Sequence, residues 1–323
     1  MALTNEQYEN IMREYAAIRE KNSALLRARR EEVRAASPEY RALDTDTGAA
    51  FLRALKSRLT GGNDDGTDAA RIVARKKALL LENGFPSDYL DEIFTCPDCR
   101  DTGYIGTRKC HCFRRREIAI LYGQSHLSEL ARTENFRMLR DDLFTGEDRQ
   151  RFLNAAGIAR QFAQNFGEKY ENLYFYGSVG TGKTFLSVCA ANEILQRGFA
   201  VIYFSAADLF DRLAAVSFDY SKRAELAALT DDLCGCDLLV IDDLGTELGG
   251  TFVAAKLFSL LNERILRRRP TIISTNLTIE DVRTRYSDRV FSRIVSSFTI
   301  CKLSGPDLRL AMKRVRRNES APV

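Results

Sequence analysis

The segment Asn172-Leu-Tyr-Phe-Tyr176 runs directly into Gly177-Ser-Val-Gly-Thr-Gly-Lys-Thr184. The second part matches the pattern G-x-x-x-x-G-K-[ST], in which glycines let backbone N–H groups turn inward around phosphate groups. The apolar residues before it predict a strand. Phe185–Arg197 predicts a helix, whose positive N-terminal end adds to the attraction for phosphate. A strand, this loop and a helix in that order indicate a phosphate-binding α/β domain.

Two side chains of this loop would take part in nucleotide chemistry. Lys183 would reach the β- and γ-phosphates of bound ATP, and the Thr184 hydroxyl would ligate Mg²⁺. We expect the loop and the residue that follows it to contact the nucleotide: Gly177, Ser178, Val179, Gly180, Thr181, Gly182, Lys183, Thr184 and Phe185.

A pair of acids follows a second apolar strand. Leu238–Ile241 precedes Asp242 and Asp243, which would therefore lie at the carboxyl end of a strand, where doubly wound sheets bind their ligands. Asp242 would hold the Mg²⁺ directly or through water. Asp243 is placed to orient the attacking water, a role that Glu fills more often in such ATPases, and Glu247 is a weaker candidate for it. The alternative is that the two acids only cap a buried strand.

From residue 148 onward, short apolar segments alternate with segments of helical length. This alternation predicts a parallel sheet with helices on both faces. The predicted strands are Leu173–Tyr176, Ala200–Phe204, Leu238–Ile241, Thr271–Ser274 and Phe298–Cys301.

The first 90 or so residues are predicted to be helical. Thr4 and Gln7 fit a capping box, and apolar residues at helical spacing follow until Ser37-Pro38. The segment 61–66 is a turn or flexible linker, and a further helix is expected over 68–83. Such a polar helical segment fits a docking surface and simple packing against the next domain equally well.

A cysteine cluster separates this helical region from the rest. Cys96-Pro-Asp-Cys99 and Cys110-His-Cys112 suit a structural zinc site with four thiolate ligands. His111 could replace Cys110 or Cys112, and an iron–sulfur cluster is the main competitor to zinc. The remaining cysteines are predicted to be buried thiols: Cys189, Cys234, Cys236 and Cys301.

Composition sets broad limits on the function. The chain is 45% hydrophobic and 28% charged, with a net charge of +4, which is too small by itself to indicate nucleic-acid binding. Basic residues do cluster at 114–116, 267–269 and 313–317, either as patches for a polyanion or as solvated helix faces. The sequence contains no apolar segment long enough to span a membrane and no signal-peptide core. We therefore expect a cytoplasmic protein with reduced thiols and no membrane partner.

The motifs resemble a known family in their order along the chain. The phosphate loop, Asp242-Asp243-Leu-Gly-Thr-Glu247 and Ser274-Thr-Asn276 are similar to those of bacterial replicative helicase loaders of the DnaC/DnaI group. These are AAA+ ATPases related to IstB-type ATP-binding proteins and to DnaA. The resemblance covers about residues 130–312. It implies an AAA+ fold of the P-loop NTPase class, preceded by a helical domain with a zinc knuckle.

The resemblance also implies roles for single residues. Asn276 matches the sensor 1 position, which places the water near the γ-phosphate. Arg293 is the first choice for an arginine finger that acts on a neighbouring subunit's ATP, with Arg289 second. Arg309 matches sensor 2, although the chain continues for too few residues to form a full helical lid. Considered without the family, each of these arginines fits a surface salt bridge.

The resemblance predicts three domains: residues 1–117, which dock on the helicase and contain the knuckle at 96–112, a linker over 118–147, and the AAA+ domain over 148–323. It implies an ATP-dependent loader of the hexameric replicative helicase that binds single-stranded DNA and forms an ATP-dependent homo-oligomer. Residues 206–236 would form a DNA-binding insertion with Phe218, Tyr220, Lys222 and Arg223, or only an amphipathic helix. The alternatives are an IstB-like transposition helper and an ATP-dependent scaffold with negligible turnover.

Overall fold

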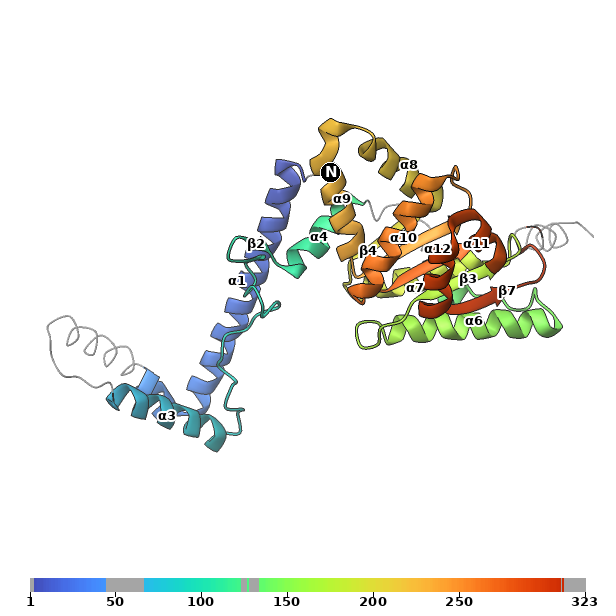
Figure 1. Ribbon diagram of the computed structural model, residues 1–323. Helices are drawn as coiled ribbons and strands as arrows, with labels where there is room; N and C mark the ends of the chain where they lie inside the picture. The colour runs from blue at the N-terminus through green and yellow to red at the C-terminus, as the bar shows by residue number, and fades with distance from the viewer. Residues whose placement is uncertain (1–2, 45–66, 123–126, 128–133, 309, 311–323) are drawn as a thin grey trace, which may run out of the picture. The chain divides into compact units, whose positions relative to one another are not determined.

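The computed structural model describes residues 3–44, 67–122, 127, 134–308 and 310 (Figure 1). The chain divides into two compact units. One is Tyr8–Cys112, and the other is Met1–Gln7 together with Phe113–Val323. Helix α4 (His111–Leu121) includes the predicted domain boundary after residue 117, and the short helix η1 (Phe136–Met138) lies within the predicted linker. The predicted division into three domains therefore stays a prediction.

The first unit is built on one long helix, α1 (Asn5–Ala36). Its predicted capping box is present: the Thr4 N–H donates to Gln7 Oε1 at 2.9 Å, and the Gln7 N–H donates to Thr4 Oγ1 at 3.2 Å. The helix ends just before Ser37-Pro38, as predicted, since the residue preceding a proline disfavours the α conformation.

Helix α3 (Thr67–Glu82) agrees with the helix expected over 68–83. Gly84 follows the end of the helix, and its φ of 81° lets the Phe85 N–H donate back to the Leu80 carbonyl at 2.9 Å. Leu79 and Leu80 pack with Val33 of α1 in a small apolar core. The predicted turn at 61–66 lies outside the described residues.

The cysteine segment of this unit contains a short hairpin. Strands β1 (Tyr104–Ile105) and β2 (Arg108–Lys109) pair antiparallel. The turn between them contains Gly106, with a φ of 60°, a backbone conformation that glycine adopts at little cost. The hairpin lies between the two cysteine pairs in the sequence, so it brings them back toward each other.

The second unit contains a five-stranded parallel sheet in the order β4-β5-β6-β3-β7 (Figure 1). All five predicted strands are present, with small shifts at their ends. Their bounds are β3 (Leu173–Gly177), β4 (Val201–Ser205), β5 (Leu238–Leu244), β6 (Thr271–Thr275) and β7 (Thr299–Leu303). The prediction of an α/β fold with a parallel sheet is confirmed.

Helices cover both faces of this sheet. Leu173 and Phe175 of β3 join the core under α6 (Gly146–Gln164) and α7 (Lys183–Gln196), whereas Tyr174 joins the core on the other face. That second face packs against α8 (Ala206–Ser217), α9 (Arg223–Gly235), α10 (Thr251–Leu266), α11 (Ile279–Tyr286) and α12 (Asp288–Ser297). Both faces of the sheet are buried, so most residues of β3, β4 and β5 are apolar.

A fully buried arginine connects three of these elements. Arg264, near the end of α10, donates from Nε to Thr271 Oγ1 at 2.9 Å and from a terminal nitrogen to the Leu233 carbonyl at 2.6 Å. It also donates to the carbonyls of Cys236 and Pro270. No carboxylate is among these partners, so hydrogen bonds to carbonyls and a hydroxyl compensate the buried charge.

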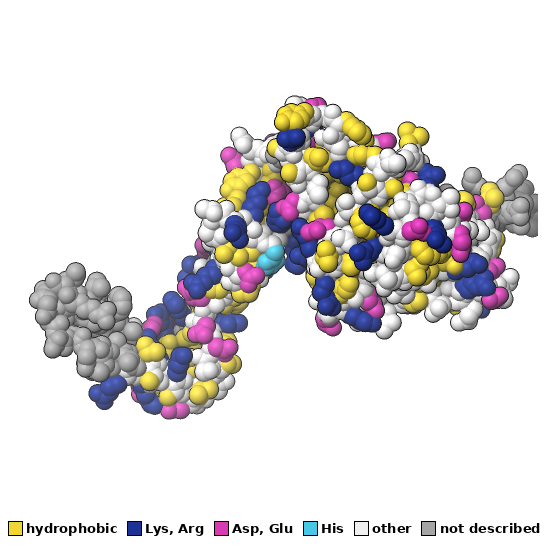
Figure 2. All heavy atoms as spheres, viewed as in Figure 1, with side chains coloured by type: hydrophobic (Ala, Val, Ile, Leu, Met, Phe, Trp, Pro, Cys, Tyr) yellow, Lys and Arg dark blue, Asp and Glu magenta, His cyan; other side chains and the backbone are white. Residues whose placement is uncertain are grey.

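The clustered surface arginines are mostly ion-paired. Arg115 and Arg269 both contact Asp237, at 3.1 and 2.8 Å, and Arg114 pairs with Asp231. Figure 2 shows acidic side chains interspersed with the basic ones on the visible face. These pairs favour the interpretation of the arginine triplets as solvated faces. The basic run at 313–317 lies outside the described residues. Among the described helices, none is both long and apolar enough to cross a membrane.

Candidate functional site

The glycines of the 177–184 loop are required by its geometry. Gly177 and Gly182 have φ values of 138° and 92°, in the region that L side chains avoid. A Cβ on Gly177 would lie 1.8 Å from the Leu303 carbonyl oxygen, and one on Gly182 would lie 2.9 Å from Phe152. The loop is thus pressed between β7 and α6, and its backbone can turn tightly only with glycine at these positions.

Lys183 is held within the loop that precedes it. Its Nζ donates to the carbonyls of Gly177 and Ser178, at 2.9 and 2.6 Å, and the residue is 4% exposed. The Thr181 hydroxyl closes the loop by donating to the same Ser178 carbonyl at 2.8 Å. The arrangement places a buried positive charge at the N-terminal end of α7, a position suited to an anion.

Asp242 is the centre of a polar cluster on four different elements. The Thr184 hydroxyl, in the first turn of α7, donates to Asp242 Oδ2 at 3.0 Å, and the Tyr203 hydroxyl of β4 donates to the same oxygen at 2.7 Å. Ser274 of β6 donates to Oδ1. The structure therefore brings the two predicted magnesium ligands, Thr184 and Asp242, into direct contact. Carboxylate and hydroxyl oxygens are the donor set that Mg²⁺ prefers.

The sequence did not predict a role for Tyr203, and Ser274 was named only as part of the Ser274-Thr-Asn276 motif, without a role at Asp242. Ser274 is a polar residue inside a buried apolar strand, and that mismatch is the signal that could have found it. The sequence signal for Tyr203 is weaker, because tyrosine is common in strands. Its burial and the nearby Asp242 carboxylate raise the pKa of the Tyr203 hydroxyl, which therefore stays protonated and donates.

Asp243 and Asn276 lie near the carboxyl ends of the neighbouring strands β5 and β6. Asp243 has a φ of 51°, next to a break in the β5–β6 register, and its N–H donates to Ser274 Oγ at 2.9 Å. Thr275 pairs with Tyr176 of β3 on one side and with β5 on the other. Asn276, which is exposed, follows immediately. Both predicted residues therefore lie at the carboxyl edge of the sheet, where β3 enters the glycine loop.

Glu247 has a different environment. Its side chain is fully buried and accepts hydrogen bonds from the Gly245 N–H at 2.8 Å and from the Tyr286 hydroxyl, and it pairs with Arg285 at 3.3 Å. Both carboxylate oxygens of Glu247 have protein partners, so this side chain stabilises the loop that follows β5. This geometry does not support a role for Glu247 in orienting the attacking water.

The arginines implied by the resemblance are placed only in part. Arg293 lies half-exposed on α12, and among the described residues its guanidinium has no hydrogen bond or ion pair. Arg289 lies 5.9 Å from the Phe258 ring centroid. Arg309 is outside the described residues. Just before it, the Leu308 N–H donates to the Gly180 carbonyl at 2.9 Å, so the end of the described chain contacts the glycine loop.

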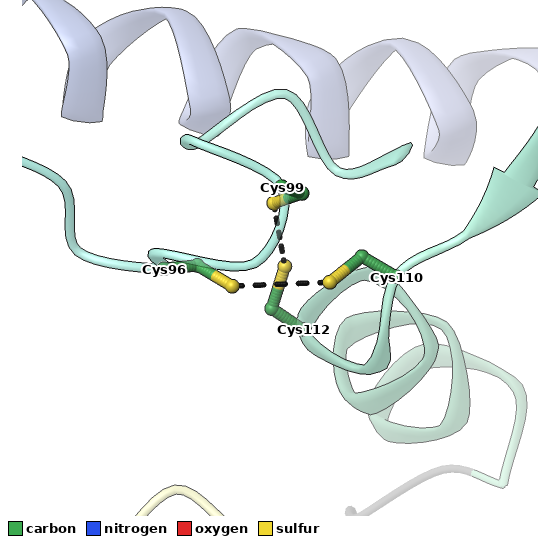
Figure 3. Close-up of side chains that lie close together, drawn as sticks. All are labelled: Cys96, Cys99, Cys110 and Cys112. Carbon is green, nitrogen blue, oxygen red and sulfur yellow. Dashed lines mark hydrogen bonds between the residues drawn. The ribbon is translucent and has the colours of Figure 1, made fainter. Parts of the chain in front are cut away.

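The four clustered cysteines converge in the other unit (Figure 3). All four sulfurs lie within 4.8 Å of one another, with Cys96 and Cys110 at 3.8 Å and Cys99 and Cys112 at 3.5 Å. A tetrahedral site with zinc–sulfur bonds of about 2.3 Å has sulfurs separated by about 3.8 Å. The sulfurs are buried or nearly so, and their spacing fits a tetrahedral ion with four thiolate ligands.

His111 is a weaker ligand candidate than the thiols. It is half-exposed and its Nδ1 lies 3.3 Å from Asp98 Oδ2. Burial opposes ionisation of Cys99, but the Gly103 N–H and the neighbouring thiols outweigh it and lower the Cys99 pKa to about 7. The other four cysteines are buried, as predicted.

The predicted insertion forms the helical pair α8 and α9, joined through η2 (Tyr220–Lys222). Phe218 and Tyr220 are both 77% exposed. The Arg223 guanidinium carbon lies 4.0 Å from the Tyr220 ring centroid. The ring centroids of Phe218 and Phe252 are 5.0 Å apart, and the Lys256 ammonium lies over the Phe252 ring. Figure 2 shows hydrophobic side chains gathered at this turn between α8 and α9. Exposed rings next to cations are suited to stacking on bases and contacting phosphates.

Known proteins are similar to this chain over the region that contains the glycine loop and Asp242. The family model of IstB-like ATP binding proteins matches residues 124–314. The replicative helicase loader DnaC of Escherichia coli K12 is 31% identical over 142 residues, which are 44% of this chain and 57% of DnaC. The chain thus spans little more than half the length of this relative. Protein XkdC of the Bacillus subtilis phage-like element PBSX is 25% identical over 262 residues, 75% of this chain and 94% of XkdC.

A solved structure of the DnaC helicase loader is 24% identical and covers 53% of this chain and 97% of its own, with a TM-score of 0.45. The family match extends over more than half of the chain and includes the glycine loop, the Asp242 cluster and Arg293. The chain belongs to the family of IstB-like ATP-binding proteins.

Proposed function

We propose that the protein is an AAA+ ATPase that hydrolyses ATP to ADP and phosphate. The contact of Thr184 with Asp242, next to the buried Lys183, is the observation on which this proposal depends. A loop for phosphates, a cation and two oxygen donors for Mg²⁺ are the parts that phosphoryl transfer requires.

Each residue then has a separate task. Thr184 and Asp242 would hold Mg²⁺, which neutralises phosphate charge when bound. Lys183 would leave the Gly177 and Ser178 carbonyls and donate to phosphate oxygens instead. Asp243 and Asn276, at the same edge of the sheet, would orient the attacking water.

The remaining positive charge would come from a second copy of the chain. The Arg293 guanidinium is half-buried and has no hydrogen bond or ion pair to the described residues, which supports this role, because a finger must be accessible to a neighbouring subunit. Arg309 would contact the nucleotide in its own subunit, which the contact of Leu308 with the glycine loop supports. ATP would thus promote assembly of a homo-oligomer.

We propose that the biological role is to load the hexameric replicative helicase in the cytoplasm. The similarity to DnaC and the cysteine-containing unit ahead of the ATPase region support this role. That unit would bind the helicase, and hydrolysis would time its release. The similarity to XkdC is compatible with the same loading activity in a phage-like element.

The second candidate is a helper ATPase in transposition, acting with a transposase on duplex DNA. The match to the IstB-like family favours it. The cysteine unit favours the loader, because helicase loaders of one group have a zinc-binding docking domain there and IstB-type helpers generally do not. A scaffold that binds ATP with negligible turnover is the third candidate.

The four cysteines would bind one zinc ion with a structural role. Four buried sulfurs at tetrahedral spacing leave no position open for a substrate. The turn between α8 and α9 would bind single-stranded DNA through Phe218, Tyr220, Lys222 and Arg223. The exposed rings and the arginine stacked on one of them support this assignment.

Affinity capture with the full-length, tagged chain tests the biological role. In the presence of a non-hydrolysable ATP analogue, we expect it to retain a hexameric helicase from the cells that encode it. Deleting residues 8–112 should abolish that capture while ATP binding persists. Capture of a transposase without the helicase would support the second candidate and contradict the loader.

A further inference from the structure

One face of helix α1 contacts the cysteine site. Tyr15, Arg19 and Asn22 follow one another at spacings of four and three residues, which places them on the same side of a helix. All three form hydrogen bonds to the segment 95–112. Figure 3 shows the ribbon of α1 passing beside the cysteine loops. The helix is therefore part of the environment of the four sulfurs.

The contact nearest the ligands is made by Tyr15. Its hydroxyl lies 3.0 Å from Cys112 Sγ, and the residue is 1% exposed, so water does not compete for the sulfur. The Gly103 N–H donates to a second sulfur of the site, Cys99 Sγ, at 3.3 Å. Cys99 and Cys112 are 3.5 Å apart, so both sulfurs of this pair have a hydrogen-bonding partner outside the pair.

These partners match the charge of an occupied site. Four thiolates around a divalent cation leave a net charge of about −2 in a buried environment. A hydroxyl that donates to a thiolate disperses part of that charge, and such charge-assisted bonds are stronger than neutral ones. When Cys112 is a thiolate, Tyr15 must be the donor of the pair.

A buried carboxylate keeps α1 in register with the loop. Asp101, 1% exposed, accepts from the N–H groups of Cys96 and Thr95 at 2.7 and 2.9 Å. It also accepts from the Asn22 amide at 2.9 Å, and its carbonyl accepts from Arg19 at 2.7 Å. Asp101 therefore links Cys96 to Arg19 and Asn22 on two turns of α1. These bonds hold the helix where Tyr15 contacts Cys112.

We propose that Tyr15 is a positioning residue of the metal site, and that metal binding and the docking of α1 on the cysteine loops are coupled. The hydroxyl stabilises the Cys112 thiolate and strengthens metal binding, and the bound metal in turn orders the helical face. This inference rests on the proposed metal site at the four cysteines. The inference extends the proposed metal site, because it adds to the site a helix that is remote in sequence from the cysteines.

The test compares Tyr15→Phe with Tyr8→Phe in the full-length chain. Both changes remove one hydroxyl from α1, but the Tyr8 hydroxyl contacts Tyr104, at 3.3 Å. Removing outer-shell partners weakens metal sites by about 10–100-fold, so we expect Tyr15→Phe to bind zinc at least about tenfold more weakly in competition with a chelator. Tyr8→Phe should bind zinc as tightly as the wild-type chain.

The spectrum of the Co²⁺-substituted chain separates the hydrogen bond from packing. A thiolate that loses its donor transfers charge to the metal more easily, so the sulfur-to-cobalt band of Tyr15→Phe should move to longer wavelength. Weaker binding with an unchanged band would mean that Tyr15 only packs, and would overturn the proposed role. Equal affinity together with an unchanged band would overturn it as well.

Hydrogen exchange on the wild-type chain tests the coupling without any variant. Amides around Tyr15 should exchange slowly in the zinc-loaded protein and faster after the metal is removed. Unchanged protection would show that α1 docks independently of the metal and would contradict the coupling. A wild-type chain that binds neither zinc nor cobalt would instead refute the proposed metal site itself, which keeps the two failures distinguishable.

Discussion

The Thr184 hydroxyl lies 3.0 Å from an Asp242 carboxylate oxygen, although the two residues are 58 positions apart. Thr184 follows β3 and Asp242 belongs to β5, and β6 lies between these two strands in the sheet. The contact is made over the carboxyl edge of β6, whose Ser274 donates to the same carboxylate. The strand order β5-β6-β3 is therefore needed to bring Thr184 and Asp242 together.

Lys183→Ala should abolish ATP binding, because the loop would lose its one positive side chain against several phosphate charges. Titration with a fluorescent ATP analogue measures the effect. Lys169→Ala is the matched control, since Lys169 is exposed and pairs with Glu171. Wild-type affinity in the Lys183 variant would show that the nucleotide binds elsewhere.

Asp243→Asn should keep ATP binding and lose turnover, because the amide preserves the shape of the side chain but orients the attacking water poorly. Phosphate release and analogue binding, measured on the same preparation, separate the two effects. Glu247→Gln should instead lower stability, since Glu247 is buried and paired with Arg285. Normal turnover in Asp243→Asn would contradict the proposed role of that residue.

The purified chain should contain about one zinc ion, and Cys96→Ser should lose it. Because metal binding supplies folding free energy to such sites, the unit Tyr8–Cys112 should become protease-sensitive while the five-stranded sheet stays folded. Metal analysis and limited proteolysis are the measurements. Cys301→Ser, at a buried position of the edge strand β7 outside the cluster, should retain zinc. Stoichiometric iron with visible absorbance would identify an iron–sulfur cluster instead.

Arg293→Ala should reduce turnover by about a thousandfold or more while ATP binding changes little, as for other arginine fingers. A mixture of Arg293→Ala and Lys183→Ala chains should regain activity, because the lysine variant can donate its arginine to the intact site of its partner. Specific activity of the wild type should rise with protein concentration. If no mixing ratio exceeds the sum of the two variants, although both fold and associate, Arg289 becomes the residue to test.

Arg264→Met should destabilise the second unit by about 3 kcal/mol or more. The change leaves the carbonyls of Leu233, Cys236 and Pro270 without their donor, and a buried unsatisfied group costs about 1–3 kcal/mol. Urea unfolding followed by circular dichroism measures the loss. Arg267→Met, one turn on and largely exposed, should change stability by less than about 0.5 kcal/mol. Equal stability of the two variants would contradict a structural role for Arg264.

Much of the nucleotide site could be predicted from residues 172–184 and 238–243 alone. The glycine loop has steric requirements that few sequences meet, and apolar strands buried on both faces are recognisable from composition. Parallel strands also place their carboxyl ends at one edge, so Asp242 and the loop were expected to meet. The cysteine cluster could also be recognised from the sequence as a metal site, because the spacing of the two close pairs suits a tetrahedral site.

The partners of these residues depend on the packing of distant elements. Tyr203 and Ser274 contact Asp242 only because β4 and β6 flank β5, and Glu247 is buried because α11 brings Arg285 and Tyr286 against it. Likewise, Tyr15 reaches Cys112 across 97 positions of sequence. Local sequence determines backbone conformation and apolar faces, whereas hydrogen bonds between side chains depend on strand order and helix docking. Those contacts became visible only in the folded chain.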